Sequence, residues 1–164
     1  MALISYPATR ARHDSVYDYA TTRTRFEEEV PVLNPSVAIE LVTARARWEV
    51  VEAAVHNRVG PHGLLALTRL DQGAMLSLSG RPLEATLYLV GNPLIARRLT
   101  DIDPAAALYA PFRVAIYRDQ EWVSIAYDQP SAVFASLGSA AIDEIATELD
   151  DKIAHAATSV CRLD

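Results

Sequence analysis

The chain of 164 residues is long enough for one domain with a sizeable core, and we expect a single domain over residues 1–164. Hydrophobic residues make up 51% and charged residues 22%, a globular balance that excludes a disordered chain. The formal net charge of −6 lacks the basic footprint with which nucleic-acid binders displace counterions from phosphates. Only Arg97, Arg98 and Arg113 suggest a local basic patch, so we expect no nucleic-acid partner.

Cysteine content and hydropathy limit the compartment. Cys161 is the only cysteine, so the chain can form neither an internal disulfide nor a multi-cysteine metal site. The apolar run within Met1–Pro7 is too short for a signal peptide, and no window approaches the roughly 20 apolar residues that span a bilayer. These features predict a soluble cytoplasmic protein without a membrane partner.

The first third of the chain predicts a strand followed by helices. Residues 12–18 are expected to form the first strand. Within residues 23–33, apolar side chains recur at spacings of four and three, which predicts a short helix that Thr21 or Thr22 would cap. Asn34-Pro35 then combines a good N-cap with a proline suited to the first helical position, so a helical region is expected through His56. A strand is the competing interpretation after Pro35, because apolar residues alternate there at first.

The middle of the chain predicts strands separated by short helices. Residues 63–70 and 84–90 are apolar runs expected to be strands, with a turn at residues 71–73 and either a loop or a sheet extension at residues 74–80. Gly91-Asn92-Pro93 then opens a short helical excursion through Thr100, and Asp103-Pro104 repeats the same capping pattern.

The final third predicts a hairpin and a long helix. Residues 112–118 and 122–128 are expected to pair around a tight turn, followed by a helical turn at residues 131–134. After Gly138-Ser139, apolar positions step by three and four, which predicts an amphipathic helix. The complete order is strand, helix, four strands, helix, and it predicts an α+β fold with an antiparallel sheet and helices packed on one face.

Four short motifs in this order resemble a known bacterial family. They are Leu87–Pro93, Asp103-Pro104, Ala110-Pro111 before a strand, and Asp128–Pro130 at the end of the hairpin. Together they resemble domain of unknown function 302 (DUF302), with a family-like core over residues 9–160. The resemblance implies a fold similar to the TATA-box-binding-protein class and, since several members are dimeric, a homodimer. The family has no agreed activity, and this chain departs from it in a longer helical region at residues 20–56.

Side-chain alternation predicts a ligand-binding face on the sheet. Successive residues of a strand point to opposite faces. In each of the last three strands, one set is mostly aliphatic and is expected to meet the helices. The other set combines aromatic rings with polar groups, which suits a ligand platform, although an ordinary solvated face is the simpler interpretation. Its members are Thr86, Tyr88, Arg113, Tyr117, Trp122 and Ser124.

Several residues are candidates for chemistry. Asn92 could hydrogen-bond a ligand at a helix N-terminus, but its position favours a simple N-cap. His62 at a helix-to-strand junction, Tyr109 before Pro111 and Asp128 at a strand end are acid–base candidates, each with an equally ordinary structural role. The histidines show no metal-ligand spacing, and the chain has no phosphate-binding loop or dinucleotide fingerprint, so neither a metal nor a cofactor is expected.

These observations predict a domain that binds a small apolar or amphipathic molecule, either between the sheet and its helices or across the aromatic face. Two alternatives remain open. The first is a cofactor-independent cyclase, isomerase or hydrolase that uses His62, Tyr88, Tyr109 or Asp128. The second is a structural module whose aromatic face is a dimer interface.

Overall fold

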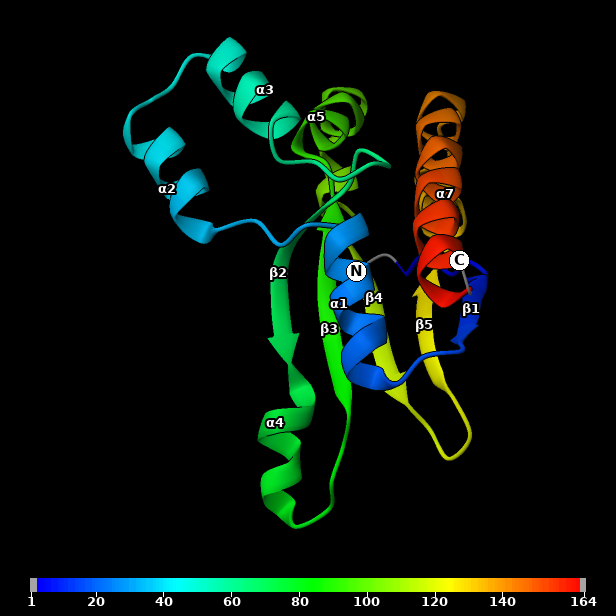
Figure 1. Cartoon of the computed structure of the whole chain (residues 1–164). Coiled ribbons are helices and arrows are strands. Elements are labelled where there is room, and N and C mark those ends of the chain that lie inside the picture. Colours follow the sequence, from blue (N-terminus) through cyan, green and yellow to red (C-terminus); the bar gives the residue numbers. More distant parts are fainter. Residues whose placement is uncertain (1–2, 163–164) are drawn as a thin grey trace.

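The structure is a computed structural model that describes residues 3–162, so the first two residues of the N-terminal run and the last two of the chain lie outside it. The fold is α+β, as the sequence predicts, with one five-stranded sheet in the order β1-β5-β4-β3-β2 (Figure 1). Every neighbouring pair is antiparallel. The strands are β1 Arg10–Ser15, β2 Leu65–Asp71, β3 Ala85–Gly91, β4 Phe112–Arg118 and β5 Val123–Asp128.

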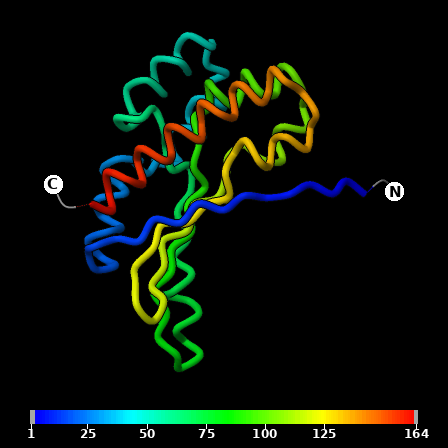
Figure 2. The backbone as a smooth tube through the Cα atoms, turned by 90° about the vertical axis from the view of Figure 1, so that its right-hand side faces the viewer, coloured from blue at the N-terminus to red at the C-terminus, as the bar shows by residue number. Residues whose placement is uncertain are grey.

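Helices cover one face of this sheet and leave the other largely open. Helix α1, Tyr19–Glu29, and the long α7, Ala140–Cys161, pack together against the same face, and Figure 2 shows both on one side of the strands. The other α-helices are α2 Pro35–Thr43, α3 Trp48–His56, α4 Gln72–Leu76, α5 Pro93–Ile102 and α6 Pro130–Phe134. Three 3₁₀ helices complete the described residues: η1 Ser77–Ser79, η2 Pro104–Leu108 and η3 Ala135–Leu137.

Local capping chemistry starts three of these helices where the sequence predicts. The side-chain oxygens of Asn34, Asn92 and Asp103 accept backbone N–H bonds at 3.0, 2.8 and 2.8 Å, and a proline follows each cap. These bonds satisfy N–H groups that have no partner within the helix. The competing strand interpretation after Pro35 is therefore wrong.

The apolar stripe of α7 is the largest contribution of a single helix to the core. The predicted stripe is buried at every position, and burial of each large side chain removes apolar area from water. Its members are Ile142, Ile145, Leu149, Ile153, Ala156 and Val160. Within residues 3–162, no helix has both the length and the apolar character that crossing a membrane requires.

Two local predictions are wrong. The first strand begins and ends earlier than residues 12–18, and Asp18 rather than Thr21 or Thr22 caps α1, because its carboxylate accepts a bond from the Thr21 N–H at 2.7 Å. Residues 72–79 form α4 and η1 instead of a turn followed by a loop or strand extension, since Asp71 accepts the Ala74 N–H at 2.9 Å.

The predicted facing of β3 is also wrong. Tyr88 pairs with Val114 of β4, so it lies on the helix-covered face and is fully buried. The alternate positions, including Leu87 and Leu89, therefore lie on the open face and are half-buried. Both sets are apolar enough to pack, and the hydrogen-bonded register with β4 decides between them.

Candidate functional site

A cavity of about 540 Å³ lies where the open sheet face meets the N-terminal segment and the loop before β4. It brings together Tyr109, Arg113 and Asp128, three residues predicted from the sequence to have functional roles. Its other lining residues are Tyr6, Ala8, Leu89, Leu108, Pro111, Phe112 and Val133. The site therefore combines an apolar floor with a few polar groups, the usual composition of a small-molecule pocket.

A second hollow of about 380 Å³ continues along the open face and shares Arg113 and Asp128 with the first. It adds Tyr117, another predicted ligand-binding residue, and an apolar strip formed by Leu87 and Ala115. The two hollows form one continuous surface, which we call the sheet cavity.

The polar groups of the sheet cavity are held by contacts from distant parts of the chain. Asp128 accepts two hydrogen bonds from Arg10, at 2.8 and 3.3 Å, across the β1–β5 pair. The hydroxyl of Tyr109 lies 2.9 Å from Ser136 Oγ, and its ring meets Tyr6 edge-on with 6.1 Å between centroids. A hydrogen bond with Tyr109 raises the pKa of the Tyr6 phenol, so both hydroxyls stay protonated at neutral pH.

Arg113 is the one cation of the sheet cavity that has no counterion. Its side chain is exposed, and among residues 3–162 no hydrogen bond or ion pair holds its guanidinium. Because Arg10 already neutralises Asp128, Arg113 leaves the site with one uncompensated positive charge. A guanidinium presents a fork of N–H donors that matches a carboxylate or phosphate, so the site favours anions.

Two predicted ligand residues, Thr86 and Tyr88, face away from this site. The Thr86 hydroxyl is buried 2.6 Å from that of Tyr19. Tyr88 donates to Glu27 Oε1 at 2.7 Å, and burial is the main cause that raises its pKa. The predicted aromatic face is therefore divided between the two sides of the sheet.

Two further predicted residues lie away from the cavity lining. Ser124 is fully buried and donates to Asp14 Oδ1 at 2.7 Å. Trp122 lies in the hairpin turn before β5 and is 48% exposed. Neither residue lines the sheet cavity.

Asn92 is fully engaged in structure. Its side-chain oxygen caps α5, and its Nδ2 donates to the Gly63 carbonyl at 2.9 Å. It borders an apolar cavity of about 250 Å³ beneath α5, but neither polar atom is free to bind a ligand there.

His62 lies in a separate surface hollow formed with α7. Its Nε2 is 3.0 Å from Glu29 Oε2, and its ring stacks on His155 with 6.1 Å between centroids. The hollow also contains Lys152, and it shares no lining residue with the sheet cavity. The four predicted acid–base residues therefore do not converge on one reacting centre. Within the described residues, no cluster of three or more His, Cys, Asp or Glu side chains is arranged to hold a metal ion.

Sequence reasoning missed Tyr6 and Arg10, the two N-terminal residues of the site. The pairing of Arg10 with Asp128 requires the β1–β5 register, which joins residues 118 positions apart. The only available signal was opposite charge on two residues predicted to lie near strand ends.

The helix-covered side of β1 provides a pH-dependent element. The His13 ring stacks on Tyr127 with 5.9 Å between centroids, and burial is the main cause that lowers the pKa of His13, followed by the charge of Arg162. Burial likewise raises the pKa of Tyr127 to about 12. Both groups are therefore neutral in the folded chain near pH 7.

We expect this histidine to weaken the fold in mild acid. Its folded pKa lies below the unfolded value of about 6.5, so the unfolded chain binds the proton more tightly and stability falls as the pH drops through this window. His13→Phe keeps a ring over Tyr127 and should flatten the dependence of the free energy of unfolding on pH below about 6.5. Urea unfolding between pH 5 and 8 measures this effect. The same change at the exposed His56 should leave the slope as it is, and equal slopes in all three proteins would contradict the prediction.

The fold and the cavity define a single-sheet α+β protein with one face covered by helices and an anion-favouring hollow on the other. The model of the family named domain of unknown function DUF302 matches residues 39–160, and the chain belongs to this family. A crystal structure of a conserved DUF302 protein from Bacillus stearothermophilus has a similar fold, with a TM-score of 0.66 and 15% identity over 93% of this chain and 98% of that one. No curated protein matches the chain.

Proposed function

We propose that the chain binds a small, partly apolar molecule with an anionic group in the sheet cavity. The observation that carries this proposal is the unpaired guanidinium of Arg113 above an apolar floor. A ligand carboxylate or phosphate would pair with Arg113, while its apolar part would cover Leu87, Leu89 and Ala115. Tyr109 and Tyr117 flank this position and offer hydroxyls for further hydrogen bonds.

An enzymatic role stays a prediction with narrower support. Tyr109 and Asp128 share the sheet cavity, whereas His62 and Tyr88 lie elsewhere, so an acid–base pair in this cavity would have to be Tyr109 and Asp128. The ion pair with Arg10 keeps Asp128 in its charged form, which suits anchoring better than proton transfer.

The proposal is tested with benzoate as the probe and benzamide as its uncharged counterpart. Arg113→Gln should weaken benzoate binding by about tenfold or more, because a hydrogen bond to a charged group contributes about 1.5–3 kcal/mol, and should leave benzamide binding unchanged. Ligand-observed and protein-observed NMR titrations measure both affinities.

Arg118→Gln is the matched control for this experiment. Arg118 lies on the same strand but forms an ion pair with Glu84 outside the sheet cavity, so its replacement should not change benzoate binding. Equal benzoate affinity in the wild-type and Arg113→Gln proteins would contradict the proposal.

A further inference from the structure

Helices α2 and α3 form a groove that the rest of the molecule leaves open. The pair projects from the body at one end of the sheet (Figure 1), and the groove between the two helices has a volume of about 370 Å³. Leu65 of β2 and Pro93 of α5 close its inner end. This size lies at the lower end of the range for small-molecule pockets.

The groove lining is almost entirely apolar. Both helices direct aliphatic side chains into it, and Trp48 forms part of one wall. The apolar lining consists of Leu33, Val37, Ala38, Leu41, Val42, Ala46, Trp48, Val51, Ala54, Val55, Leu65 and Pro93.

The helix α2 has no buried residue although its sequence is predominantly apolar. A nine-residue helix is marginal in water unless tertiary contacts cover its apolar side. Ile39 and Val42 are 64% and 78% exposed. The open groove therefore leaves unburied the contacts that would stabilise α2, and an apolar occupant would supply them.

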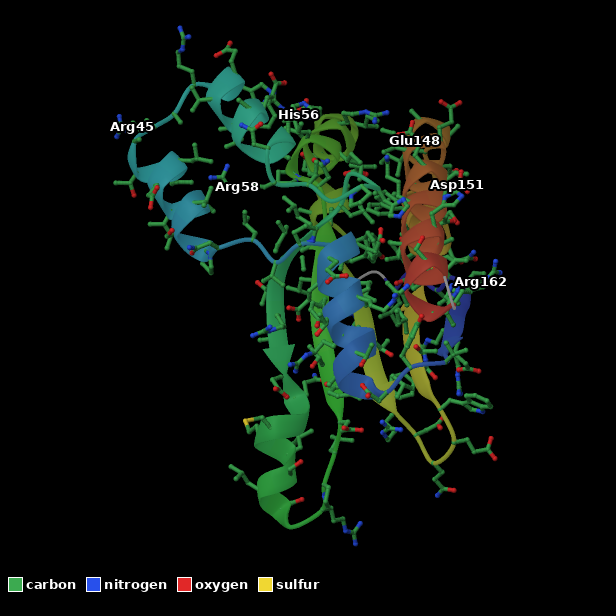
Figure 3. All side chains as sticks on the ribbon, viewed as in Figure 1. Arg45, His56, Arg58, Glu148, Asp151 and Arg162 are labelled. Carbon is green, nitrogen blue, oxygen red and sulfur yellow. The ribbon has the colours of Figure 1, made fainter. Side chains whose placement is uncertain are left out.

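Two arginines set the charge of the groove. Arg45 lies in the turn that joins the helices, and Arg58 follows α3 with its side chain directed toward the space between them (Figure 3). Among residues 3–162, neither guanidinium forms an ion pair, and Arg58 makes one hydrogen bond, to the Ala54 carbonyl at 2.8 Å. No acidic residue lines the groove.

The nearby carboxylates of α3 are occupied elsewhere. Glu49 pairs with Arg47 at 3.7 Å, and Glu52 accepts a hydrogen bond from the Trp48 indole at 2.7 Å. The groove thus offers cationic groups beside a hydrophobic channel, with no internal anion to neutralise them.

Arg45 occupies a backbone position that glycine would fill more easily. Its φ of 47° is left-handed, and the bonds Ala46 N–H to Leu41 O and Arg45 N–H to Val42 O close a Schellman turn after α2. Glycine is the usual residue at this position because a side chain is unfavourable there. The arginine side chain is therefore not needed for the turn.

From this arrangement we infer that the α2–α3 groove binds an amphiphilic anion, a linear alkyl chain with a carboxylate head. The chain would lie along the aliphatic walls, and Arg45 and Arg58 would hold the head. This site is separate from the sheet cavity, so the inference does not rest on the function proposed above.

The experiment uses decanoate as the probe and the fluorescence of Trp48 as the signal. Trp48 and Trp122 are the two tryptophans, so the Trp122→Phe background isolates the groove. We expect saturable decanoate binding, with affinity rising about fourfold per methylene from hexanoate until the groove is full. Arg45→Gly and Arg58→Gln should each weaken decanoate binding by about tenfold and leave 1-decanol binding unchanged.

The controls separate charge from folding. Arg45→Gly places the favoured residue in the turn, so it should preserve α2 while removing the charge, and circular dichroism checks this. Arg47→Gln and Arg113→Gln remove arginines that do not line the groove and should leave decanoate binding unchanged. Since Arg113→Gln reports on benzoate alone, failure of either proposal can be told from failure of the other.

Two results would overturn the inference. One is decanoate binding that is absent, or that is unaffected by both Arg45→Gly and Arg58→Gln. The other is a dimer in sedimentation experiments whose Trp48 signal does not respond to decanoate, because a second copy would then occupy the groove.

Discussion

Tyr88→Ala is expected to lower the free energy of unfolding by about 3–5 kcal/mol, the cost of removing a large aromatic side chain from a packed core. The ring is fully buried and lies against Phe26 with 5.0 Å between centroids. Its hydroxyl reaches Glu27, which also pairs with Arg69. The loss is a large part of the stability of an ordinary domain, and urea unfolding measures it.

Two companion variants separate packing from polarity and test the facing of β3. Tyr88→Phe keeps the ring and should cost about 1–2 kcal/mol, because only the hydrogen bond to Glu27 is lost. Leu87→Ala changes the next residue, which is half-buried on the open face, and should cost about 1 kcal/mol. A Tyr88→Ala protein no less stable than Leu87→Ala would contradict the assignment of Tyr88 to the core.

Gly60→Ala is expected to destabilise the fold by about 3 kcal/mol through a clash with backbone atoms. An added Cβ would lie 2.0 Å from the Glu29 carbonyl oxygen and 2.7 Å from Pro31 Cδ. The loop cannot shift easily, because hydrogen bonds join Gly60 to Leu64 and to Gly63. For a chain of this length the loss corresponds to a melting temperature lower by about 6–12 °C in a thermal unfolding experiment.

Gly91→Ala is the matched control. Its Cβ would meet Pro111 Cβ at 3.5 Å, an ordinary van der Waals contact, so the melting temperature should change by no more than about 3 °C. Equal effects of the two substitutions would show that the close approach at Gly60 is relieved without cost.

Much of the fold was predictable because its signals are local. A cap needs only a side-chain oxygen and N–H groups two or three residues ahead, so Asn34, Asn92 and Asp103 identify helix starts correctly. The hairpin of β4 and β5 depends on a short connection, and the helix α7 on a repeating stripe. Asp71 shows the limit of such signals, because the same capping chemistry begins α4 where a turn was predicted.

The candidate site was predictable only in part. Tyr109, Arg113, Tyr117 and Asp128 were chosen from local features, and the structure places them on one cavity surface. Thr86 and Tyr88 were assigned to the same face because their polarity was taken as the guide. Their hydroxyls instead have partners on α1, at Tyr19 and Glu27, and a partnered hydroxyl can be buried at little cost.

The sequence by itself determined where most helices begin, which segments pair in the hairpin, and the α+β order, because these depend on residues close together in the chain. The tertiary structure alone decided which side of β3 is buried, that Arg10 neutralises Asp128 and leaves Arg113 unpaired, and that α2 and α3 enclose an apolar groove. These outcomes depend on strand register and on contacts between distant segments, and the free energies of such contacts are not encoded in any local pattern.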